Sequence, residues 1–123
     1  MVAVKRELDF ELCRMILLKL EELWDIGMTG TPDDYMFEGY GVENILYNIN
    51  KLASARLVKV RGADDYHREI LSVLPTGFTE MGWGFVALSK DDARWSRAVA
   101  AVNAQDGPES IVPLKVELFR EMA

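Results

Sequence analysis

Few residues of the sequence have the types and spacing that catalysis or metal binding requires. His67 is the single histidine and Cys13 the single cysteine, so a tetrahedral histidine–cysteine zinc site cannot be assembled from them. The acidic pairs Asp33-Asp34, Asp64-Asp65 and Asp91-Asp92 are adjacent in sequence, which suits solvated turns and helix caps better than a general acid–base pair. No Gly-x-Ser-x-Gly nucleophile motif is present. We therefore expect a protein that acts without catalysis, metal or cofactor.

The polar residues whose chemistry suits binding lie on a predicted central helix. Its apolar residues recur at three- and four-residue steps, which predicts one buried face: Val42, Ile45, Leu46, Ile49, Leu52 and Ala53. Asn44, Asn48 and Lys51 are then expected on one exposed ridge, with Tyr47 beside them. Asparagine can pair with the edge of adenine, and lysine can reach guanine or phosphate. The ridge therefore predicts contacts in a groove of double-stranded DNA.

The charge of the chain is unevenly distributed. Its net charge of −6 opposes binding to nucleic acid, because phosphate contacts supply most of the non-specific affinity. Residues 51–68 nevertheless carry a net charge of +3, from Lys51, Arg56, Lys59, Arg61 and Arg68 against Asp64 and Asp65. The four basic residues that follow Lys51 are expected to contact phosphate. The alternative is a solvated hairpin that carries arginines without a binding role.

The elements before the central helix are a long helix and a short strand. The apolar stripe of residues 6–24 predicts a helix over Arg6–Trp24, with Asp9 as its cap or within its first turn. Residues 25–34 are predicted to form a loop because two glycines and a proline interrupt the pattern. Tyr35–Glu38 is aromatic-rich and bounded by turn residues, which predicts a small strand.

Two strands are predicted directly after the central helix. They are Leu57–Arg61 and Ile70–Leu74, joined by the polar loop Gly62–Glu69, and Pro75–Gly77 is expected to end the second strand. A helix followed by a strand, a polar loop and a second strand is how a winged helix-turn-helix presents its recognition helix and wing.

Three further helices are predicted toward the C-terminus. Thr79 is expected to cap a helix that extends through Leu88, in which Gly82 and Gly84 allow close backbone packing. Ser89–Asp92 resembles a capping box that opens the next helix. Pro113 is expected as the first residue of the last helix.

Together these elements predict an α+β, winged-helix-like single domain over residues 1–123. The helix-turn-helix is degenerate, because Pro32 and several glycines between Trp24 and Tyr40 leave little room for the helix that normally precedes a recognition helix. A two- to three-stranded wing sheet and extra C-terminal helices complete the prediction. Composition is that of an ordinary globular chain, without a membrane-spanning run or a signal-peptide pattern. A cytoplasmic location, with no membrane partner, is therefore expected.

Several stretches in this order and spacing resemble a small bacterial and phage-associated family known only as a domain of unknown function: Asp9–Glu21, Glu38–Tyr40, Ile45–Ile49, Ala55–Val58, Phe78–Phe85 and Trp95. The resemblance implies a winged-helix-like fold and a prophage origin. It implies no particular activity.

The sequence departs from the pattern of this family at four positions. Asn48 and Trp83 stand where the family often has histidine, and Ala87 stands where it often has an acid. If those positions form a catalytic or metal site in the family, this chain lacks it. Arg56 replaces the glycine that would end the central helix in a left-handed conformation. Either Arg56 adopts a positive φ at a cost of about 1 kcal/mol, or the helix ends differently.

Two functions remain open from the sequence. The preferred one is a small, non-catalytic DNA-binding transcriptional regulator, and the close alternative is a protein–protein interaction adaptor on the same scaffold that does not bind DNA. The adaptor would use aromatic residues left exposed among a large set: Trp24, Tyr35, Phe37, Tyr40, Trp83, Trp95 and Phe119. A homodimer is expected under either function.

Overall fold

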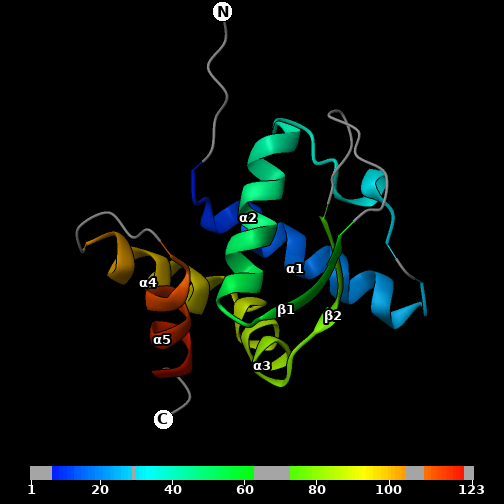
Figure 1. Ribbon diagram of the computed structural model, residues 1–123. Coiled ribbons are helices and arrows are strands. Elements are labelled where there is room, and N and C mark those ends of the chain that lie inside the picture. Colours follow the sequence, from blue (N-terminus) through cyan, green and yellow to red (C-terminus); the bar gives the residue numbers. More distant parts are fainter. Residues whose placement is uncertain (1–6, 29, 63–72, 105–109, 121–123) are drawn as a thin grey trace, which may run out of the picture.

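Helix α2 lies across helix α1, and the remaining elements pack around this pair (Figure 1). The computed structural model describes residues 7–28, 30–62, 73–104 and 110–120. Within them the chain forms α1 (Phe10–Asp25), the 3-10 helix η1 (Pro32–Tyr35), α2 (Val42–Ser54), β1 (Val58–Gly62), β2 (Val73–Phe78), α3 (Glu80–Ser89), α4 (Asp92–Asn103) and α5 (Val112–Arg120). Five α-helices and a two-stranded antiparallel sheet confirm the predicted α+β class with a wing-like strand pair.

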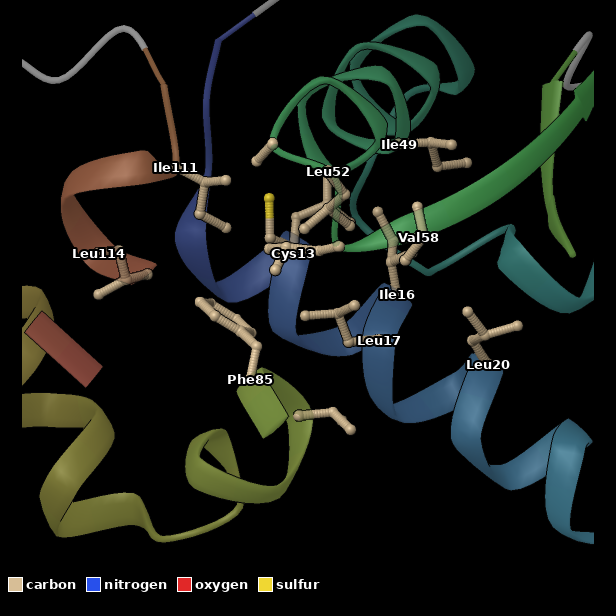
Figure 2. Packing of buried hydrophobic residues seen from close by; sticks show 14 of the residues in the cluster. Cys13, Ile16, Leu17, Leu20, Ile49, Leu52, Val58, Phe85, Ile111 and Leu114 are labelled. Atoms are coloured by element: carbon tan, nitrogen blue, oxygen red, sulfur yellow. The ribbon is translucent and has the colours of Figure 1, made fainter. Parts of the chain in front are cut away.

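The core lies where α1 meets α2, β1, α3 and α5. Figure 2 shows Ile16 and Leu17 of α1 beside Leu52 of α2, Phe85 of α3 and Leu114 of α5, and all five are fully buried. Burying one such side chain stabilises the folded state by about 1.5–3 kcal/mol. The helical spacing of the apolar residues in the sequence therefore predicted correctly that the apolar faces of α1 and α2 are buried.

Helix α1 begins directly after its predicted cap. The side chain of Asp9 accepts a hydrogen bond from the backbone N–H of Leu12 at 3.0 Å, and Asp9 itself has an extended backbone. The first helical residue is consequently Phe10, so the predicted start at Arg6 was too early. An N-cap residue satisfies one of the free N–H groups of the first turn from outside the helix.

The predicted strand at Tyr35–Glu38 is wrong. Pro32–Tyr35 forms a 3-10 helix, which Thr31 and Asp34 open as a capping box. The backbone N–H and the hydroxyl of Thr31 both donate to the Asp34 carboxylate. This local hydrogen bonding favours a tight turn over an extended chain.

The wing is an antiparallel pair with one irregularity. Lys59 pairs with Gly77 and Val60 with Pro75, so Thr76 is an extra residue in β2. Proline is tolerated at such a bulge because its missing N–H leaves no ladder bond unmade. The prediction that Pro75–Gly77 ends the second strand was therefore wrong, since β2 continues to Phe78. Residues 63–72, which include most of the predicted loop and the start of the predicted second strand, lie outside the described residues.

The junction between α2 and β1 settles how the central helix ends. Arg56 adopts a φ of 60°. Its N–H donates to the carbonyl of Ala53 at 2.9 Å, and the N–H of Leu57 donates to the carbonyl of Leu52 at 3.1 Å. These two bonds form a Schellman motif, whose left-handed position usually holds glycine. Arg56 therefore accepts the strained conformation, the first of the two expected alternatives.

Helix α3 packs directly on this junction. Thr79 caps α3 as predicted, since its hydroxyl accepts from the N–H of Gly82 at 3.0 Å. A Cβ added at Gly82 would lie 1.8 Å from the carbonyl oxygen of Leu57. The predicted close backbone packing at this glycine is confirmed, because only the absence of a side chain permits the approach.

Helices α4 and α5 close the other side of the core (Figure 1). The cap of α4 is Asp91, which accepts from the N–H of Arg94 at 2.9 Å, and that bond lowers the pKa of the Asp91 carboxyl. The predicted capping box opening at Ser89 was wrong, since Ser89 is the buried last residue of α3 and donates to the carbonyl of Val86. Pro113 is the second residue of α5 rather than the first. None of the helices in the described residues is long and apolar enough to cross a membrane.

Candidate functional site

The expected exposed ridge of α2 does not exist, because two of its three residues are buried. Asn44 is 3 % exposed and Asn48 fully buried. The side-chain oxygen of Asn44 accepts from the N–H of Glu7 at 2.8 Å, and that of Asn48 accepts from the N–H of Asp9 at 2.8 Å. The amide nitrogen of Asn48 donates to the carbonyls of Glu7 and Asn44. Neither amide can reach the edge of a base while it makes these bonds.

The physical reason is the chain segment that precedes α1. Residues 7–9 lie along the flank of α2 and present backbone donors and acceptors that need buried partners. The two asparagines, one helical turn apart, supply these partners. Cys13 lies in the same network and points its thiol at the oxygen of Asn48 at 3.4 Å. Burial and the nearby Asp9 carboxylate raise the pKa of the Cys13 thiol, so it remains protonated and unreactive.

The other two α2 residues of the predicted site stay at the surface. The ammonium group of Lys51 lies over the ring of Tyr47, 5.2 Å from its centroid, and both side chains are half-buried. A cation over an aromatic ring stabilises by about 0.5–1 kcal/mol at exposed sites. Tyr47 and Lys51 are thus neighbours, without the asparagines that were expected to complete a base-reading ridge.

A basic strip remains along the start of the wing. Arg56, Lys59 and Arg61 are all exposed, and Lys59 and Arg61 point to the same face of β1 because they are two residues apart on a strand. Three such cations can contact phosphate oxygens. Arg68, the fourth expected phosphate contact, lies outside the described residues.

The element that precedes α2 does not support it as a reading helix. In a helix-turn-helix, a first helix packs across the recognition helix and holds it in the groove. Between α1 and α2 the described chain contains only the four-residue η1. The predicted degeneracy of the helix-turn-helix is therefore visible in the structure.

A second surface, which we call the Trp24 face, is formed by Trp24, Met28 and Trp83 with the hollow beside them. Trp24 is 53 % exposed, Met28 58 % and Trp83 37 %. The two indole rings meet edge to face with centroids 5.8 Å apart, and Trp83 also lies 4.4 Å from the ring of Phe78. The aromatic rings of α1, β2 and α3 thus form one continuous cluster that water reaches from one side.

The hollow beside Trp24 has a volume of about 270 Å³. Its lining comes from the end of α1, the turn that follows and the bulge of β2: Leu20, Trp24, Gly27, Met28, Gly30, Pro75 and Thr76. Small-molecule sites usually have roughly 300–1,000 Å³. The hollow is below that range and suits one large side chain of a partner.

The predicted set of aromatic residues includes buried, exposed and half-buried members, the last being Phe37, Tyr40 and Phe119. Tyr35 is fully buried and Trp95 nearly so, while Trp24 and Trp83 are exposed. The indole N–H of Trp95 donates to the Glu11 carboxylate at 2.6 Å. Sequence reasoning placed Trp24 on the inward stripe of the first helix, because its spacing from Leu20 fits that stripe. Among the described residues, no element covers Trp24 at the end of α1, so its side chain is 53 % exposed.

Metal-ligating side chains do not gather in the described part of the chain. Among those residues, no three His, Cys, Asp or Glu side chains lie close enough together to hold a metal ion. His67 lies outside them. The hydroxyl of Tyr35 is buried with no hydrogen-bond partner among the described residues, and burial and the nearby Asp34 carboxylate raise its pKa.

Comparison with known proteins gives one assignment. A comparison with curated proteins found no match, and a comparison with solved structures found none. The sequence pattern of DUF2513, a family described as hypothetical protein, matches residues 7–108, which include α1 to α4 and both strands. The match covers well over half of the chain and agrees with the resemblance drawn from its sequence. The chain belongs to the DUF2513 family of hypothetical proteins.

Proposed function

We propose that the protein is a non-catalytic adaptor that binds another protein through the Trp24 face. The observation that carries the proposal is the pair of exposed indole rings, Trp24 and Trp83, beside a hollow of side-chain size. Each tryptophan combines a large apolar area with a rigid shape, and adjacent exposed apolar side chains form the kind of patch that marks interaction sites. It is also among the residues that dominate the binding energy of protein interfaces.

The position of the Trp24 face supports this use. Trp24 belongs to α1 and Trp83 to α3, and both helices contribute to the core. Gly77 of β2 lies directly under the Trp24 ring, where an added Cβ would be 3.6 Å from it. The rings are therefore held by rigid elements, so binding would cost little side-chain ordering.

The test is capture of partners by the full chain after nuclease treatment. Trp24→Ala is expected to lose the captured protein, because truncating an interface anchor typically costs about 2 kcal/mol or more of binding energy. Val116→Ala is the matched control, since Val116 is 48 % exposed on α5 and lies outside the proposed surface. Thermal unfolding of both variants shows that they remain folded. Equal capture by Trp24→Ala and the unchanged chain would refute the proposal.

A second candidate function is a DNA-binding regulator, for which the basic strip supplies the specific observation. Arg56, Lys59 and Arg61 stay exposed in one short segment of a chain whose net charge is −6. Such a protein would contact the phosphate backbone through β1 and the preceding turn. Asn44 and Asn48 have no place in this version, and a prophage origin would be consistent with it.

Fluorescence anisotropy of labelled duplex DNA at two salt concentrations tests the second candidate. Binding through the strip is expected to weaken steeply with salt. The double variant Lys59→Glu with Arg61→Glu should abolish it. Lys90→Glu with Arg120→Glu changes the net charge equally at exposed positions outside the strip and should retain it. Equal weakening by the two pairs would mean that only the net charge matters, and the strip would then be an ordinary solvated strand.

A further inference from the structure

We infer that the partner of the Trp24 face is a basic peptide segment with one large apolar side chain that enters the hollow. This inference rests on the proposed adaptor function and adds the chemistry of the partner. Its first support is the charge of the surrounding chain. Residues 20–50, which supply most of the lining of the hollow, contain seven acidic residues and no basic one.

Two of these acids lie in elements next to the hollow and have no ion-pair partner among the described residues. Asp25 follows Trp24 directly, and Asp33 lies on η1, whose Tyr35 ring packs against Gly30 at the edge of the hollow. Both carboxylates are exposed, and within the described residues neither forms an ion pair, whereas Glu21 is paired with Lys90. The elements next to the hollow therefore carry two exposed carboxylates that an incoming cation can approach, and we call Asp25 and Asp33 the acidic rim.

The end of α1 adds to this negative potential. The carbonyl end of a helix carries a partial negative charge, which basic residues in the last turn usually offset. The last turn of α1 has no basic residue and instead contains Glu22 and Asp25. This arrangement is unfavourable for the isolated helix. It is favourable for a partner whose lysine or arginine approaches the end of α1.

The aromatic rings favour the same partner. The faces of indole rings attract ammonium and guanidinium groups, so Trp24 and Trp83 can hold a basic residue as well as an apolar one. The hollow of about 270 Å³ admits a single side chain. A segment with one aromatic or aliphatic anchor and flanking basic residues would therefore satisfy both the hollow and its rim.

The negative charge near the hollow argues against two other occupants, a second copy of the chain and a nucleic acid. In a symmetric dimer through this face, the acidic rim of one copy would meet the same rim of the other, and like charges would repel. A nucleic acid would bring further negative charge to Asp25 and Asp33. A basic protein segment is the occupant whose charge complements the site.

Selection of peptides tests the inference directly. The probe is a displayed library of random 12-residue peptides, selected on the full chain and counter-selected on Trp24→Ala. Enriched peptides are expected to contain one large apolar residue and two or more lysines or arginines. Their affinity, measured by anisotropy of the labelled peptides, should fall at least about 30-fold with Trp24→Ala, as for an interface anchor. It should also decrease as salt is raised.

Charge variants separate the role of the rim from that of net charge. Asp25→Asn with Asp33→Asn is expected to weaken the enriched peptides by about fivefold or more, as for loss of two exposed charge pairs. Asp92→Asn with Glu117→Gln removes the same charge from α4 and α5, where both residues form surface ion pairs. This control pair should change the affinity less than twofold. Circular dichroism confirms that each variant is folded.

The outcomes distinguish this inference from the function on which it rests. If the enriched peptides depend on Trp24 but contain no basic residues and bind independently of salt, the inference of a basic partner is wrong and the adaptor function is retained. Failure to enrich any peptide that depends on Trp24 would overturn both. A dimer in light scattering that Trp24→Ala dissociates would replace the basic segment by a second copy of the chain, which also overturns the inference.

Discussion

Arg56 is a residue held in a conformation that its type disfavours. Its φ of 60° is required by the Schellman motif that ends α2 and directs the chain into β1. Replacing it by glycine removes the strain on the Cβ, so Arg56→Gly is expected to raise the free energy of unfolding by about 0.5–1 kcal/mol. Urea denaturation measures the change.

Ser54→Gly provides the matched comparison for this position. Ser54 is the exposed last residue of α2 with ordinary helical geometry, so glycine there should lower the stability by up to about 1 kcal/mol. The same loss at both positions would mean that Arg56 is not strained.

Asn48 is expected to be among the polar residues most important for stability. Asn48→Ala would remove the buried side-chain amide that bonds the N–H of Asp9 and the carbonyl of Glu7 at partly buried positions. Each unsatisfied buried group costs about 1–3 kcal/mol, so we expect a loss of about 3 kcal/mol in the free energy of unfolding by urea. Asn50→Ala, on the exposed side of the same helix, should change it by less than about 0.5 kcal/mol. A small effect at Asn48 would indicate that water replaces the amide.

At this scale, the sequence predicted local contacts well and distant ones poorly. Asp9 and Thr79 could be identified as helix caps because a cap bonds to an N–H only three residues away. The burial of Asn44 and Asn48 could not be predicted, because their partners are backbone groups 37 to 41 residues earlier. From the helical period alone, these two asparagines were therefore wrongly predicted to be exposed.

At the scale of elements, the approach of α3 to the end of α2 depends on one glycine. A Cβ at Gly82 would meet backbone atoms of Leu57, which cannot move without breaking the Schellman motif or β1. Gly82→Ala is therefore expected to lower the free energy of unfolding by about 3 kcal/mol or more, as severe overpacking does. Thermal or urea unfolding measures it.

Gly84→Ala separates the effect of the backbone contact at Gly82 from the gain in helix propensity, because Gly82 and Gly84 both lie within α3. An added Cβ at Gly84 would lie 3.2 Å from the ring of Phe119, a side chain that can shift. The propensity gain of about 1 kcal/mol should then leave this variant close to neutral. Similar losses at both glycines would contradict the proposed backbone contact.

The predicted elements were correct where hydrophobic spacing determined them. Helices α1 and α2 follow their apolar stripes, and β1 follows the short apolar run after α2. The errors occurred where local chemistry competed with that pattern. The Thr31–Asp34 capping box formed a 3-10 helix that ends at Tyr35, the first residue of the predicted strand, and a bulge accommodated Pro75 within β2.

For the whole molecule, the two candidate surfaces differ in how far the sequence could reveal them. The basic strip is contiguous in sequence, so its charge could be counted directly. The Trp24 face joins residues 59 positions apart, and spacing within α1 cannot show that Trp24 stays exposed in the last turn. Both hypotheses arose from the sequence. The structure was needed to show which aromatic residues of the adaptor surface stay exposed, and it removed two residues of the DNA-binding hypothesis to the core.

The last helix determines whether the segment that matches the family is a stable unit. The match ends at residue 108, but Ile111, Leu114 and Leu118 are fully buried against the rest of the chain. Each contributes about 1.5–3 kcal/mol, and a domain of this size is stable by only about 5–15 kcal/mol. A chain ending at residue 108 is therefore expected to be largely unfolded or to melt at a much lower temperature, with Phe85 and Trp95 exposed. Circular dichroism and tryptophan fluorescence on heating measure this.

Two controls define what that experiment means. Val116→Ala changes an exposed residue of α5 and should leave the melting temperature nearly unchanged. Leu114→Ala removes one buried anchor and should cost about 2–5 kcal/mol. If the shortened chain melted like the full one, α5 would be an accessory helix, and Leu114 and Leu118 in it and Ile111 just before it would contribute little to folding. The expected loss of stability in the shortened chain would instead show that α5 belongs to the same cooperative core as α1 and α3, although α5 lies beyond the family match.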